Sequence, residues 1–185
     1  MKLKLNDKWK NIPALNSDVY TPQMSFVQES RIIKHWDYMA VIPFKHTPSN
    51  KWTKYNLPEL IWINIVSELR DFGIPLPKIK EAFDTIVGKS DEQWRSIIYY
   101  LIFEPPIKYD IVIGKKEIYQ LINNHTYFWI GKEFKPSNPI VVVPKSYLNI
   151  NVNYIIERTL RNEELPNAQK LSINYFNRKL DNVMV

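Results

Sequence analysis

Two groups of cationic and polar side chains lie close together in the sequence, and both suit hydrogen bonding to phosphate. The first group is Arg31, Lys34 and His35, whose spacing of three and four residues places them on one side of a helix. Guanidinium, ammonium and imidazole groups donate hydrogen bonds to phosphate oxygens and to base edges. The second group follows in a proline-flanked segment and consists of Lys45, His46, Asn50, Lys51 and Lys54. Cations on a short ribbon can reach phosphates beside a nucleic-acid groove.

Three predicted helices must position these side chains. Residues 30–39 form the first, in which Ile32, Ile33, Trp36 and Met39 make an apolar stripe opposite the cations. The second begins after Asn56, which suits an N-cap, has a proline in its first turn and ends at a glycine, residue 73. Its apolar face is predicted to pack under the first helix. A third helix is predicted over residues 77–87, and Trp36 and Trp52 are interpreted as core residues.

In this order, the residues resemble the MerR-type transcription regulators. The matching runs are residues 34–43 at the end of the first helix, 50–55 in the ribbon, 59–61, and the stretch from 69 to 80. The resemblance implies a winged helix-turn-helix over residues 21–88, with helix 30–39 in the major groove of double-stranded DNA and a wing, residues 45–54, on the backbone. Ala40 and Lys51 stand where the family pattern has glycine, and Thr53 where it has arginine.

The segments on either side of this motif are predicted with different roles. Residues 1–20 are a basic lead-in, interpreted as an ordered segment covering the core rather than an arm on DNA, with Trp9, Ile12 and Leu15 as anchors. Residues 89–106 contain a bridging helix of about 13 residues, roughly 20 Å long and so too short for a long coiled coil. Its apolar stripe needs a cover, for which the candidates are the following strands and the same helix of a second copy: Trp94, Ile97, Ile98, Leu101 and Ile102. We expect mainly intrachain packing, with any dimer using the β-rich half as well.

The second half, residues 107–185, is predicted to be a β-rich domain of unknown role. Strands are expected at 109–113, 117–122, 126–130 and 139–143, separated by turn-forming residues, which gives a small antiparallel meander. Asn151 or Asn153 is predicted to open a helix that continues to Leu160. The last fifteen residues have a weak apolar pattern. The predicted fold class is therefore α+β, with a winged helix-turn-helix followed by a bridging helix, a meander and a C-terminal helix.

Several classes of chemistry are disfavoured by composition. The chain has no cysteine, three widely spaced histidines and four glycines, so neither a metal site nor a nucleotide-binding loop is indicated. No cofactor and no enzymatic activity are predicted. The aromatic set around Tyr99, Tyr119 and Trp129 is interpreted as core rather than as an effector pocket. The first residues lack the apolar run of a signal peptide and no segment resembles a membrane span, so the expected location is cytoplasmic.

The predicted function is sequence-specific binding of double-stranded DNA, as a bacterial-type transcription regulator. A formal charge of +6 is compatible with a polyanionic partner. The β-rich half is a candidate surface for a small-molecule effector or a partner protein, and a homodimer is left open. Two alternatives remain at this point. One is a protein-interaction module on a winged-helix scaffold that does not bind DNA, and the other is an excisionase-like architectural DNA-binding factor.

Overall fold

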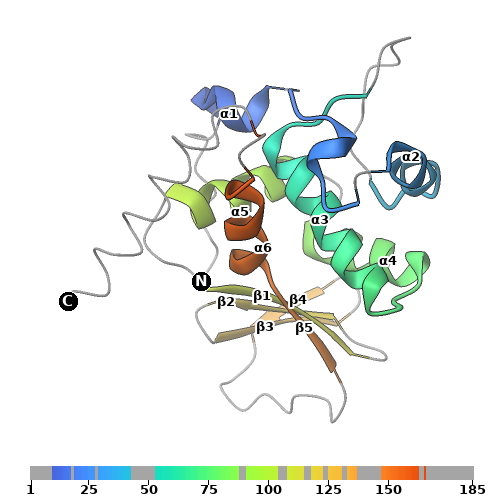
Figure 1. Cartoon of the computed structure of the whole chain (residues 1–185). Helices are drawn as coiled ribbons and strands as arrows, with labels where there is room; N and C mark the ends of the chain where they lie inside the picture. The colour runs from blue at the N-terminus through green and yellow to red at the C-terminus, as the bar shows by residue number, and fades with distance from the viewer. Residues whose placement is uncertain are drawn as a thin grey trace.

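Helices make up the first part of the described chain and strands most of the second (Figure 1). The computed structural model describes residues 10–17, 19–27, 29–42, 53–87, 91–103, 108–114, 118–122, 125–130, 133–136, 147–162 and 165. The helical elements are α1 (Pro13–Asn16), the 3-10 turn η2 (Pro22–Met24), α2 (Ser30–Tyr38), α3 (Leu57–Asp71), α4 (Leu76–Val87), α5 (Asp91–Phe103) and α6 (Val152–Leu160). The strands are β1 (Tyr109–Gly114), β2 (Ile118–Ile122), β3 (His125–Ile130), β4 (Glu133–Pro136) and β5 (Tyr147–Asn151). The predicted mixture of helices and an antiparallel sheet is confirmed.

Helix α3 lies at the centre of the molecule (Figure 1). It starts with the predicted cap: the Asn56 side chain accepts a hydrogen bond from the Glu59 backbone N–H, and the Glu59 carboxylate accepts one from the Asn56 N–H. Every residue from 57 to 67 is buried, so this helix is covered on all sides. The predicted packing of α3 under α2 thus accounts for only part of its cover, because α1, α4, α5 and α6 all contact it.

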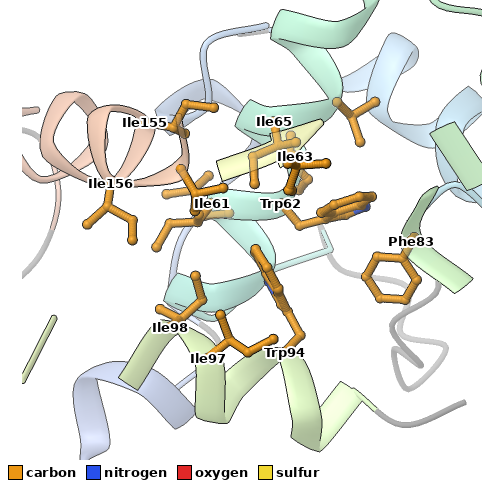
Figure 2. Close-up of a cluster of buried hydrophobic side chains, with 14 of the residues drawn as sticks. Ile61, Trp62, Ile63, Ile65, Phe83, Trp94, Ile97, Ile98, Ile155 and Ile156 are labelled. Carbon is orange, nitrogen blue, oxygen red and sulfur yellow. The ribbon is translucent and has the colours of Figure 1, made fainter. Parts of the chain in front are cut away.

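The helix predicted over residues 77–87 is confirmed as α4 within one residue, and α5 is a 13-residue helix inside the region predicted to contain the bridging helix. On α5 the whole predicted apolar stripe is buried, and its cover is intrachain. The Trp94 indole N–H donates to the Pro58 carbonyl of α3 at 2.8 Å, and the Trp94 ring lies 5.6 Å from Trp62 in an edge contact (Figure 2). The centre of the Phe83 ring of α4 lies 4.6 Å from the centre of the Trp62 ring, also in an edge contact. The expected intrachain cover is thus found, but it comes mainly from α3 and α4 rather than from the strands.

The five strands form one antiparallel sheet in the order β4-β3-β2-β1-β5. Strands β1 to β3 match the first three predicted strands, and β4 continues the antiparallel meander, whereas β5 returns to pair with β1, with Asp110 opposite Asn151. Neither β4 nor β5 was predicted from the sequence, and the predicted strand at 139–143 lies outside the described residues. Helices α4 and α6 contact one side of the sheet. Apolar residues of β1, β2 and β5 join the hydrophobic cluster that runs from Leu15 to Leu165.

Helix α6 follows β5 without a loop. Asn151 is both the last residue of the strand and the N-cap of the helix, and its side chain accepts a hydrogen bond from the Tyr154 N–H at 2.9 Å. Of the two predicted starts, Asn151 is therefore confirmed. None of the helices in the described ranges combines the length and apolar character needed to cross a lipid bilayer.

The N-terminal segment covers the core, as expected for the part that is described. Leu15 of α1 is fully buried and α1 contacts α3. The short turn η2 starts after Thr21, whose side chain makes no capping hydrogen bond, so only three residues become helical there. Trp9 lies outside the described residues. The division into regions at residues 20, 88 and 106 stays a prediction. One continuous hydrophobic cluster contains residues from all four regions, so the cluster does not mark their boundaries.

Candidate nucleic-acid interface

Helix α2 places the predicted cations on its outer side. Arg31, Lys34 and His35 are all exposed, while Ile33 and Trp36 on the opposite side are buried, with Trp36 only 5% exposed. The predicted orientation of the helix is thus confirmed, except at one residue. Met39 was predicted to continue the apolar stripe, but α2 ends at Tyr38, and Met39 is 40% exposed.

Sequence reasoning missed one exposed residue on the same side. Tyr38 is 86% exposed, the highest value among the large hydrophobic side chains that are solvent-exposed in the described ranges. It follows Lys34 by four residues and His35 by three, so the spacing that selected the cations also selects Tyr38. An exposed tyrosine offers a flat ring for base contacts and a hydroxyl that can donate or accept a hydrogen bond.

The C-terminal end of α2 is fixed by a tight backbone turn. The Val41 N–H donates to the Trp36 carbonyl and the Ala40 N–H to the Asp37 carbonyl, both at 2.9 Å. This is the Schellman pattern, which needs a left-handed residue, and Ala40 takes that conformation with φ 52°. The Val41 carbonyl then accepts a hydrogen bond from the Trp62 indole at 2.8 Å. The end of α2 is therefore tied directly to the central helix.

Acidic groups moderate the charge of this surface. The Glu29 carboxylate pairs with Arg31 at 2.9 Å, and both side chains are at least half exposed. An exposed pair of this kind contributes little stability, so a phosphate can compete for the guanidinium. Asp37 of α2 also carries a negative charge near Tyr55. Burial raises the pKa of the Tyr55 phenol far above its usual value, and the carboxylates of Asp37 and Glu59 raise that pKa further.

The predicted wing is described only at its end. Lys54 is exposed, and the next residue, Tyr55, pairs with Tyr20 through two backbone hydrogen bonds of 3.0 and 2.8 Å. This bridge joins the end of the ribbon segment to the strand-like backbone just before η2. The remaining predicted wing residues lie outside the described residues: Lys45, His46, Asn50 and Lys51.

The described residues contain no assembled metal site, since no group of three metal-ligating side chains comes together in them. Asp110 on β1 is a buried carboxylate, and burial raises its pKa, although Lys108 at 3.7 Å and a hydrogen bond from Asn149 act in the opposite direction. One buried carboxylate with a single lysine beside it does not make a catalytic constellation. The α2 surface therefore remains the candidate site.

Comparison with known proteins gives no independent identification. No protein-family model, curated protein or solved structure matches the chain.

Proposed function

We propose that this chain binds double-stranded DNA in a sequence-specific manner, as a MerR-like regulator of transcription in the cytoplasm. One observation carries the proposal: α2 holds Arg31, Lys34, His35 and Tyr38 on one exposed side while its other side is buried. An α-helix with side chains is about 10–12 Å wide, and the major groove of B-form DNA is about 12 Å wide. The exposed side of α2 therefore fits a groove that displays base edges.

Two backbone features support the same proposal. The family pattern has glycine where this chain has Ala40, and Ala40 nevertheless adopts the left-handed conformation that glycine favours. The bridge between Tyr20 and Tyr55 holds the start of the motif against the end of the predicted wing. Lys54, next to this bridge, would contact a phosphate flanking the groove.

The proposal divides the cations into two roles. Arg31, Lys34 and His35 on α2 would contact bases or set the helix within the groove, whereas Lys54 and the other wing residues would contact phosphates. Because one such module buries a limited surface, useful affinity at physiological salt would need a second copy or a partner protein. An effector or partner at the sheet is a further part of the same proposal.

The test compares three lysine-to-alanine variants on a preferred duplex, selected from a randomised pool, and on random duplex. Lys34→Ala is expected to weaken binding to the preferred duplex far more than to random duplex. Lys54→Ala is expected to weaken both and to reduce the slope of log affinity against log salt by about one unit. Lys80→Ala is the control, because Lys80 lies on α4 and is paired with Asp84 at 2.8 Å.

Two results would overturn the proposal. One is a parent chain that binds no duplex even at low salt, which would favour the protein-interaction alternative. The other is an equal loss for all three lysine variants on both duplexes, since that would indicate a diffuse charge effect rather than a helix in a groove.

A further inference from the structure

The C-terminal turn of α6 contacts the segment that leads into α2. The Arg158 guanidinium lies 4.0 Å above the centre of the Phe26 ring and pairs with Glu68 of α3 at 2.5 Å. Two residues beyond the end of α6, the Asn162 side chain donates to the Met24 carbonyl at 3.4 Å. These partners are separated by as many as 138 residues in the sequence. Helix α6 therefore packs against the N-terminal motif itself.

A buried polar chain reinforces this contact. Asn64, at 0% exposure in the middle of α3, accepts a hydrogen bond from the Phe26 backbone N–H and donates one to the Thr159 hydroxyl, both at 2.9 Å. Thr159 in turn donates to the Ile155 carbonyl at 2.7 Å. A buried amide left without either partner would carry a desolvation cost, so the three segments are held in one arrangement. We call Arg158, Thr159 and Asn162 with their partners the α6 interface.

The segment held by the α6 interface adjoins a turn that contacts α2. Met24 is the last residue of η2, and η2 contacts α2 directly. The C-terminal end of α2 is tied to α3 by the hydrogen bond between Trp62 and Val41. Besides the packing of its buried side, α2 therefore has one contact that runs to α3 alone and one that also involves α6.

We infer that Arg158 is a positioning residue for the proposed DNA-binding helix, acting through Phe26 and Glu68. This inference rests on the proposed function and extends it to the second half of the chain. Because α6 starts at the last residue of β5, any ligand or partner that shifts β5 would also shift Arg158 and the segment that it holds. The sheet then becomes a means of changing the affinity of α2 for DNA.

The chain supplies a matched pair of ion pairs for the test. Arg158 and Glu68 join α6 to α3, whereas Arg161 and Glu157 form a pair within α6 at 2.6 Å. Affinity for the preferred duplex is measured for Arg158→Ala and Arg161→Ala in the full chain, at a temperature where circular dichroism shows both fully folded. An exposed ion pair and a cation–π contact together change an equilibrium constant by a factor of about 5–10. We expect a two- to tenfold loss for Arg158→Ala and less than a 1.5-fold change for Arg161→Ala.

The acidic partners give a test of sign. Removing a negative charge raises affinity for DNA if only long-range electrostatics matters. We expect Glu68→Gln to lower the affinity instead, because it releases Arg158, and Glu157→Gln to leave the affinity unchanged or slightly raised. The salt slope separates positioning from direct contact: it should stay at the parent value in Arg158→Ala, whereas loss of a phosphate contact would reduce it by about one unit.

The outcomes separate this inference from the proposed function. A parent chain that binds no duplex overturns both. A parent that binds DNA, with Arg158→Ala and Glu68→Gln within twofold of their controls, overturns only the positioning role. A reduced salt slope in Arg158→Ala would also overturn it, since Arg158 would then contact DNA itself. Higher affinity in both Arg158→Ala and Glu68→Gln would mean that the α6 interface restrains α2, which contradicts the inference as stated.

Discussion

Replacing Ala40 by glycine is expected to increase the free energy of unfolding by about 0.5–1 kcal/mol. At φ 52° an alanine is in the left-handed region, which costs an L-residue about 1–2 kcal/mol. Glycine removes that strain but adds backbone entropy to the unfolded chain, worth about 0.4–1 kcal/mol. Residue 40 is exposed, so loss of its methyl group removes no buried contact. For a chain of this size the midpoint of thermal unfolding should rise by about 1–4 °C.

The end of α3 provides the internal control. There Gly73 has φ 77°, the Ile74 N–H donates to the Leu69 carbonyl at 3.0 Å, and the Gly73 N–H donates to Arg70 at 2.8 Å. A Cβ added at Gly73 would meet no atom within 4 Å, so Gly73→Ala tests the backbone conformation alone. We expect Gly73→Ala to lower the free energy of unfolding by about the amount by which Ala40→Gly raises it.

Urea unfolding of the parent, both single variants and the double variant, followed by tryptophan fluorescence and circular dichroism, gives all four free energies. The two turns share no hydrogen bond in the described structure, so the double variant should lie near the parent. If Ala40→Gly destabilises the chain while Gly73→Ala behaves as expected, the left-handed turn at the end of α2 is refuted.

Two further predictions concern buried side chains. Trp36→Ala should cost about 3–5 kcal/mol in urea unfolding, because Trp36 is 5% exposed; a variant that melts with the parent and loses only DNA binding would make Trp36 a contact residue instead. Burial raises the pKa of Asp110 above its ordinary 3.8, so the stability that its carboxyl contributes is complete below that pH and is lost as pH rises through the folded pKa. Asp110→Asn should therefore be more stable than the parent at pH 7 and equal to it near pH 3, and the same difference at both pH values would contradict the raised pKa.

Local signals in the sequence were sufficient for most helices. Asn56 with Glu59 three residues later predicts the start of α3, and the glycine at 73 predicts its end, because both act through hydrogen bonds within a few residues. The sequence of α3 also contains a signal for burial on every side. The run from Leu60 to Val66 is apolar at all positions but one, which is typical of a helix buried on every side rather than on one face.

Long-range pairing was beyond such signals. Strand β5 has Asn149 and Asn151 in alternation with Leu148 and Ile150, and its place beside β1 depends on β1 rather than on its own residues. The α6 interface was missed for the same reason, since Arg158 and Thr159 look like ordinary polar residues of a helix. Of the candidate site, the cations of α2 followed from helical spacing, but the pairing of Arg31 with Glu29 required coordinates.

The burial of α3 on every side has a consequence for how the chain folds during synthesis. Asn64 and the residue that completes its hydrogen bonding, Thr159, are 95 residues apart. At translation rates of about 5–20 residues per second, roughly 5–20 s pass between their synthesis. Throughout that interval the side of α3 that contacts α6 lacks its native cover, and it includes apolar side chains next to an amide without its final partner. We therefore expect nascent chains that contain α3 but lack α6 to bind molecular chaperones.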